Sequence, residues 1–147
     1  MKKFNFRLER VLDHRNSLKK EKAAELAEKN RDLFDANTRV ESIIAAQDAG
    51  GLPDKELITM AEVALSGEYQ QALRDALVNQ RLAVLEAKDA VDAARQAYIE
   101  KAVEAEVLAT LRKKMHEEHK LEGKRHDRKQ SDRMVVMRHK GKKPEAG

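Results

Sequence analysis

The sequence predicts an all-α protein, folded as a long antiparallel two-helix coiled-coil hairpin with an overhanging C-terminal helical arm. In two long stretches, apolar residues recur mostly at steps of three, four or seven, which places them along one face of a helix. A Gly-Gly-Leu-Pro break at 50–53 separates these stretches. Charged residues make up 38% of the chain and only five residues are aromatic, too few large side chains to fill a thick globular core.

The first helix is expected over residues 4–49. Its apolar stripe comprises Phe4, Leu8, Val11, Leu18, Leu26, Leu33, Ala36, Val40, Ile43 and Gln47. The step from Leu18 to Leu26 passes through Lys22 and is wider than the others. Such a step acts as a stutter, so we expect the supercoil to be unwound locally there.

A turn is expected at 50–53, because Gly50 and Gly51 can adopt the left-handed conformation that ends a helix and a proline follows. Asp54 and Ser66 are both residue types that cap helix N-termini. With these two capping residues, a short helix at 54–65 is possible. A long second helix is then expected at 66–138 and a disordered basic tail at 139–147, all within a single elongated domain.

The second helix carries its own apolar stripe. Its members are Leu73, Leu77, Gln80, Val84, Ala87, Val91, Ala94, Tyr98, Lys101, Ala105, Leu108 and Met115. With a turn at 50–53, this stripe would place Leu8 beside Ala94, Phe4 beside Ile99 and Phe34 beside Tyr69. Because the hairpin uses both stripes internally, we expect a monomer, although the same stripes would also serve a homodimer.

Charge is distributed unevenly along the chain. Residues 1–111 hold 17 Lys/Arg against 20 Asp/Glu, whereas residues 112–147 hold 13 against 6. A basic arm could bind nucleic acid through phosphate contacts. The arm has no interleaved aromatic residues for base stacking, and acidic residues dilute it, which argues against nucleic acid. The apolar run Met134–Met137 in this arm has nothing of its own to cover it and suggests a protein partner.

The sequence offers no chemistry for an enzyme. It has no cysteine, no phosphate-binding glycine loop and no catalytic motif, and a two-helix hairpin has no concave pocket. His116, His119 and His126 lie among lysines that repel a cation, so we expect solvated surface histidines and no metal site. No cofactor and no small-molecule substrate are expected. Apolar runs are far shorter than the roughly 20 residues that span a bilayer, which predicts a soluble cytosolic chain.

The segment FNFRLERVLDHR, residues 4–15, resembles the N-terminal signature of the flagellar FliJ family. That signature is aromatic-x-aromatic-x-Leu-Glu-x-Val-Leu-x-x-Arg at the start of a long helix. The general plan is also similar, with a charge-rich helix, a turn, an alanine-rich helix and a basic tail. The resemblance implies a soluble component of the flagellar type III protein export apparatus, in bacterial motility and chemotaxis. Family members form a coiled coil similar to the gamma stalk of rotary ATPases and are described as general export chaperones.

The resemblance also implies partners. These are the flagellar export ATPase and its regulator, the cytoplasmic domain of the membrane export gate, and substrate-specific export chaperones. It places the protein in the cytoplasm, peripherally associated with the cytoplasmic face of the inner membrane. A virulence injectisome stalk would share this architecture, and a nucleic-acid-binding or a structural coiled coil remain alternatives.

Two sets of interaction residues follow from the resemblance. The segment GEYQQALRDALVNQRL, residues 67–82, is similar to the family's gate-contacting segment and implies a gate site at Tyr69, Leu73, Ala76 and Gln80. The corresponding first-helix face, Ala36, Val40, Ile43 and Gln47, lacks the aromatic residues of other members. The end carrying both termini enters the ATPase ring in this family, and N-terminal apolar residues exceed what one narrow seam can absorb. The implied ATPase site is Phe4, Phe6, Val11, Leu12, Leu108, Leu111, Lys113, Lys114, Lys124 and Arg125.

Overall fold

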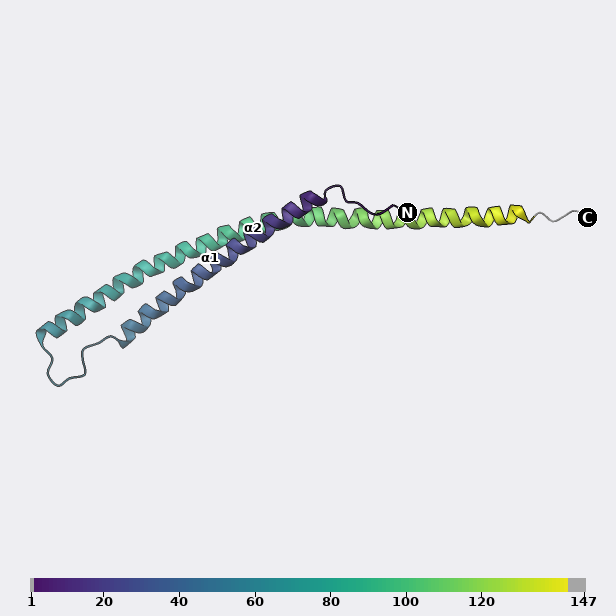
Figure 1. The fold of residues 1–147 in the computed structure, drawn as a ribbon. Coiled ribbons are helices and arrows are strands. Elements are labelled where there is room, and N and C mark those ends of the chain that lie inside the picture. The colour runs from purple at the N-terminus through teal and green to yellow at the C-terminus, as the bar shows by residue number, and fades with distance from the viewer. Residues whose placement is uncertain (1, 143–147) are drawn as a thin grey trace, which may run out of the picture. The chain divides into compact units, whose positions relative to one another are not determined.

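The computed structural model describes residues 2–142, which form two α-helices, α1 (Glu9–Ala49) and α2 (Met60–Gly141), joined by a loop (Figure 1). No strand occurs in this range. The helices pack against each other in an antiparallel pair, which confirms the predicted fold class. Their contacts fall into two compact units, the loop unit (Leu18–Lys101) and the terminal unit (residues up to 17 together with those from 102 onward). That the whole chain forms one domain stays a prediction.

Helix α1 begins five residues later than predicted. Residues 2–6 are not helical, and the Glu9 backbone N–H donates to the Phe6 carbonyl at 3.1 Å, which closes the first turn. At the other end, the Gly50 N–H donates to the Ala46 carbonyl at 2.9 Å. A Cβ at position 50 would lie 2.3 Å from the Gln70 side-chain nitrogen, so glycine permits this close approach. No glycine in the described range has a positive φ, contrary to the expected left-handed helix end.

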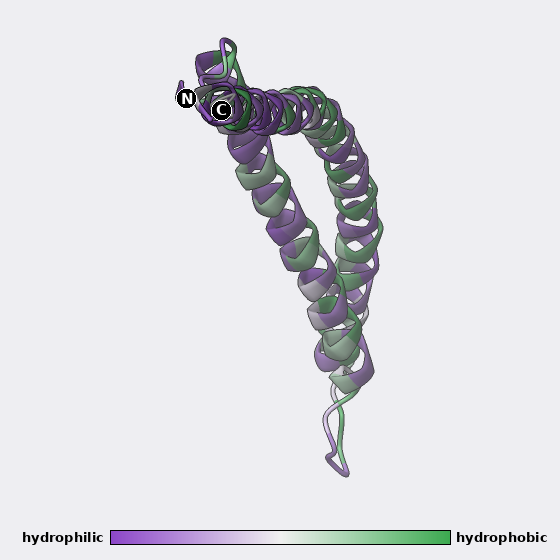
Figure 2. Ribbon diagram, turned by 90° about the vertical axis from the view of Figure 1, so that its right-hand side faces the viewer, coloured by the Kyte–Doolittle hydropathy of each residue, from purple (hydrophilic) through white to green (hydrophobic). Residues whose placement is uncertain are grey.

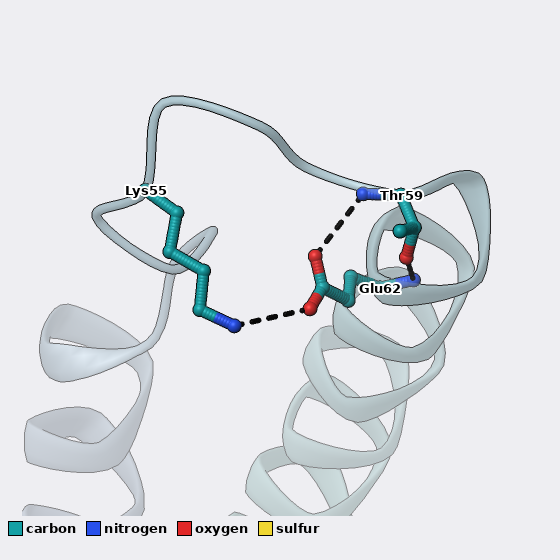
Figure 3. A network of polar contacts seen from close by, with 3 residues as sticks. All are labelled: Lys55, Thr59 and Glu62. Carbon is teal, nitrogen blue, oxygen red and sulfur yellow. Dashed lines mark hydrogen bonds and ion pairs between the residues drawn. The ribbon is translucent and has the colours of Figure 1, made fainter.

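The loop covers residues 50–59 and is longer than the predicted turn at 50–53. It ends at a capping box, in which the Thr59 hydroxyl accepts from the Glu62 N–H and the Glu62 carboxylate accepts from the Thr59 N–H, both at 3.1 Å (Figure 3). Lys55 also pairs with Glu62, at 3.2 Å. Neither Asp54 nor Ser66 begins a helix. Residues 60–65 are the first turns of α2, and the helix continues through Ser66 and Gly67 without a break.

The core of the loop unit is the predicted seam. Every predicted seam position from Leu18 to Gln47 on α1 and from Leu73 to Lys101 on α2 is at least partly buried, Lys22 included. Ala36, Val84 and Val91 are the most buried, at 7%, 9% and 4% exposed. Hydrophobic segments recur along both helices between hydrophilic ones, as expected when one stripe of each helix is buried (Figure 2).

The predicted register is wrong. The Gln80 side-chain amide donates to the Ala36 carbonyl at 3.3 Å, whereas a turn at 50–53 would place Ala36 opposite Gly67, more than three helical turns earlier on α2. Phe34, expected beside Tyr69, is 70% exposed. Part of the shift comes from the loop, because its ten residues delay the start of α2. The rest arises because Gly50, directly after α1, lies against Gln70, so that the first residues of α2 extend beyond the end of α1.

The terminal unit shows the same shift. Phe4 packs beside His116 and His119 and not beside Ile99. Phe6, Leu12 and Ala105 form its core, with exposed fractions of 4%, 6% and 2%. Residues 2–5 line a groove with α2 that extends to His126, so the N-terminal segment accompanies α2 up to that residue. The overhanging arm is therefore residues 127–142. Of the predicted tail at 139–147, residues 139–141 are helical and 143–147 lie outside the described residues.

Candidate interaction surfaces

The described residues offer surfaces for partners and no enclosed site. Within 2–142, no three His, Asp or Glu side chains are grouped closely enough to hold a metal ion. Over the same range, neither helix has an apolar stretch long enough to cross a membrane. One hollow, of about 850 Å³, is an open groove in the terminal unit between Lys2–Asn5 and the 115–126 segment of α2.

Aromatic contacts fix the N-terminal segment to α2. The Phe4 ring meets His116 edge to face at a centroid distance of 4.7 Å and His119 at 5.5 Å. The Arg112 guanidinium lies 6.0 Å from the ring centre, within cation–π range. His116 and His119 are therefore partly buried, and the prediction of solvated histidines is wrong for both. It fails because the register brings Phe4 onto them, while His126 remains exposed.

Two ion pairs join α1 to α2 in the terminal unit. Arg112 donates to the Glu9 carboxylate at 2.8 Å, and Arg15 donates to Glu104. All four side chains are between a third and a half exposed, so each pair contributes about 1 kcal/mol or less to stability. Their main effect is specificity, because each pair forms in only one register.

The residues predicted for the ATPase site divide into two groups. Phe6 and Leu12 are buried, and Phe4 and Leu108 are partly buried. These four side chains therefore pack inside the terminal unit and are not free for a partner. Val11 is 41% exposed and Leu111 38% exposed. The cations of the set are exposed, namely Lys113, Lys114, Lys124 and Arg125. The surface open to a partner is therefore Val11, Leu111 and these four cations.

The residues predicted for the gate site are likewise divided. Tyr69 is 52% exposed and lies outside the seam. Leu73, Ala76 and Gln80 are partly buried, and Gln80 is bonded to Ala36. The first-helix face, Ala36, Val40, Ile43 and Gln47, lies entirely in the seam. Of these eight residues, only Tyr69 projects largely into solvent.

Sequence reasoning named Tyr69 but missed the rest of an apolar surface around the loop. We name it the loop surface and define it by the large apolar side chains between residues 52 and 69 that are more than half exposed. They are Leu52, Leu57, Met60, Leu65 and Tyr69. Leu57 and Met60 are exposed by more than four fifths, which is unusual for residues of this size and marks a contact surface. The signal was present in the sequence, because all five residues lie between Gln47 and Leu73, where neither predicted apolar stripe extends.

The arm is a third surface. Residues 127–142 are all exposed and carry six Lys/Arg against two Asp. Met134, Val135, Val136 and Met137 are 52–72% exposed, and four consecutive helical residues point to nearly all sides of the helix. Within the described residues, nothing covers the apolar side chains of Met134–Met137.

Comparison with known families identifies one family whose model matches nearly the whole chain. The profile of FliJ, described as flagellar FliJ protein, matches residues 4–144 of the 147-residue chain. The match begins at Phe4, the first residue of the N-terminal motif, and includes the loop surface and the arm. Neither the search of curated proteins nor the search of solved structures returned a significant match. Because the matched region covers almost the whole sequence, the chain belongs to the FliJ family of flagellar proteins, a family associated with flagellar protein export.

Proposed function

We propose that this protein is a coiled-coil coupling element of the flagellar type III export apparatus. In this role the terminal unit binds the export ATPase ring, and the loop unit binds the cytoplasmic domain of the membrane export gate. The protein would act at the cytoplasmic face of the inner membrane and escort substrate-specific export chaperones. The observation that carries the proposal is the family match over residues 4–144, which includes both surfaces.

The terminal unit has the chemistry for an acidic partner such as a ring interior. Exposed Val11 and Leu111 can supply apolar contact, and Lys113, Lys114 and the arm supply positive charge. Charges at the rim of an interface mainly raise the association rate, whereas desolvated apolar contacts mainly slow dissociation. We therefore expect the two kinds of residue to act on different rate constants.

The loop unit has a surface suited to the gate. Tyr69 and the other residues of the loop surface are each more than half exposed and lie outside the predicted seam, so we expect their substitution to disturb the seam little. Aromatic residues are enriched among interface anchors, which makes Tyr69 the leading candidate. Leu73 lies in the seam, four residues after Tyr69.

ATP hydrolysis by the purified export ATPase tests the first contact. The full chain should stimulate hydrolysis, and a chain ending at His126 should keep the N-terminal contacts to α2 while stimulating poorly. Val11→Ala with Leu111→Ala should also reduce stimulation. Phe34→Ala is a matched control, since Phe34 is exposed but lies in the loop unit. Full stimulation by the chain ending at His126 would show that the arm has no part in coupling.

Calorimetric titration with the purified gate domain tests the second contact. Tyr69→Ala and Leu57→Ala should each weaken binding while the melting temperature stays unchanged. Lys19→Gln, a substitution in the same unit outside the loop surface, should leave binding unchanged. Equal affinity of the wild-type chain and the Tyr69→Ala, Leu57→Ala double variant would rule out the loop surface as the gate site.

A further inference from the structure

Helix α2 carries a second apolar stripe outside the seam. Val78, Leu82 and Leu85 follow one another at steps of four and three, so they share one face, and they are 59%, 55% and 57% exposed. All three belong to the loop unit. Asp75 and Asp89 lie one heptad to either side of Leu82 and bound the stripe. The apolar part therefore extends over two turns of helix, about 10 Å.

A row of cations borders this stripe on one side. Arg74, Arg81, Lys88 and Arg95 recur every seven residues, which places them on one line along a coiled coil, and all four are exposed. Arg74 donates to the Gln71 side-chain oxygen at 3.5 Å. Among residues 2–142, no acidic group forms an ion pair with Arg81, Lys88 or Arg95. The other side of the stripe carries Asn79 and Glu86, so the face is asymmetric in charge.

A second copy of the chain fits this face poorly. In an antiparallel pair related by a two-fold axis at Leu82, the cation row would face itself and place Arg81 against Arg81. In a parallel pair, Asp75 and Asp89 would each face their own copies. Like charges directly opposed across an interface are destabilising. A partner with an apolar stripe of its own and acidic side chains facing the cation row would cover the exposed apolar residues and pair with the cations.

We propose that this face binds an amphipathic α-helix of another protein, whose apolar stripe is flanked on one side by acidic residues at heptad spacing. The apolar residues would cover Val78, Leu82 and Leu85, while the acidic residues would pair with the row from Arg74 to Arg95. That row extends over about 32 Å, which sets a length of roughly six turns for the partner helix. The aliphatic stems of arginine and lysine add to the buried apolar surface. This inference goes beyond the coupling function and stands without it, since it concerns a face that neither the ATPase nor the gate proposal uses.

Two synthetic helical peptides test the proposal. They share one apolar stripe, but one carries a glutamate row and the other a lysine row at the same positions. Each is labelled with a fluorophore and titrated with the full chain, with binding followed by fluorescence anisotropy at low and high salt. The glutamate peptide should bind and should bind more weakly at high salt, because added salt screens exposed charges. Equal binding of the lysine peptide, or no binding of the glutamate peptide, would overturn the proposal.

Variants of the chain locate the contact. Changing Val78, Leu82 and Leu85 to serine should raise the dissociation constant by about tenfold or more. Neutralising the row, with Arg74, Arg81, Lys88 and Arg95 changed to glutamine, should weaken binding and remove its salt dependence. The matched control changes four cations of α1 in the same unit, Lys19, Lys20, Arg31 and Arg39, to glutamine and should bind as the wild type does.

Three results would contradict the assignment. Equal weakening by the control would mean that net charge alone attracts the peptide. Loss of helicity in the serine variant would mean that the stripe is part of the packing. Self-association by sedimentation, abolished in the serine variant, would mean that a second copy occupies this face in place of an acidic helix.

Discussion

Replacing Phe6 by alanine tests whether burial of this side chain holds the N-terminal segment in the terminal unit, or whether Phe6 is free to bind a partner. Phe6 is only 4% exposed although it precedes α1, and its carbonyl accepts the bond that closes the first turn. Burying a side chain of this size contributes roughly 1.5–3 kcal/mol. The cavity left by the substitution adds to the loss, so we expect residues 2–17 to be destabilised by about 2–4 kcal/mol.

Native-state hydrogen exchange measures this effect locally. Because 1.4 kcal/mol corresponds to a factor of ten, exchange in peptides covering residues 2–17 should accelerate by about 30-fold or more. Peptides from the middle of the loop unit should be unaffected. Phe34→Ala is the control, since Phe34 is 70% exposed and its loss should change stability by less than about 0.5 kcal/mol. Unchanged exchange in the Phe6→Ala variant would show that Phe6 is not buried in solution and is open to a partner.

Three further predictions concern other parts of the molecule. Thr59→Ala should destabilise the start of α2 by about 1 kcal/mol through loss of the cap, measured as faster exchange over residues 60–66, and unchanged exchange there would contradict the capping role. Leu73→Ala should lower the melting temperature whereas Tyr69→Ala should not, because Leu73 lies in the seam and Tyr69 outside it; equal melting temperatures would refute that distinction. Glu9→Gln should reduce stability by less than about 1 kcal/mol in chemical denaturation, with the difference shrinking at high salt, and a larger, salt-independent loss would mean that the pair with Arg112 is effectively buried.

The sequence alone was sufficient for the seam because the heptad pattern is local. Most seam positions from Leu18 to Gln47 follow from a neighbour three or four residues away, Leu33 lies one heptad after Leu26, and the wide step from Leu18 to Leu26 could be read directly through Lys22. Tertiary packing does not override such a pattern when the partner is a similar stripe. The fold class was therefore accessible before any coordinates.

The register was not accessible in the same way, since it depends on where the loop ends. Thr59 and Glu62 match the Ser/Thr-x-x-Glu capping signature, so the start of α2 could have been predicted, but Gly50, Gly51 and Pro53 gave a more conspicuous signal. The misplaced helix start accounts for part of the shift in the cross-helix contacts, and the extension of α2 beyond the end of α1 accounts for the rest. The consequence for the predicted ATPase site is clear at Phe6 and Leu12. With the observed register both side chains are buried inside the terminal unit, whereas the predicted register left them as surplus apolar residues for a partner. Whether any of the predicted site residues binds a partner depends on surfaces of other molecules, which a single sequence does not contain.

The contact between Phe4 and the 112–119 segment of α2 also constrains the order of events during synthesis. The ribosome makes the two sides of this contact more than a hundred residues apart, whereas Ala36 and Gln80 are only 44 residues apart. Packing in the loop unit can therefore begin while translation continues. Phe6 and Leu12 leave the ribosome long before the part of α2 that packs in the terminal unit with them. For that interval the nascent N-terminus is an exposed apolar segment, the kind of sequence that general chaperones of the translating cell bind.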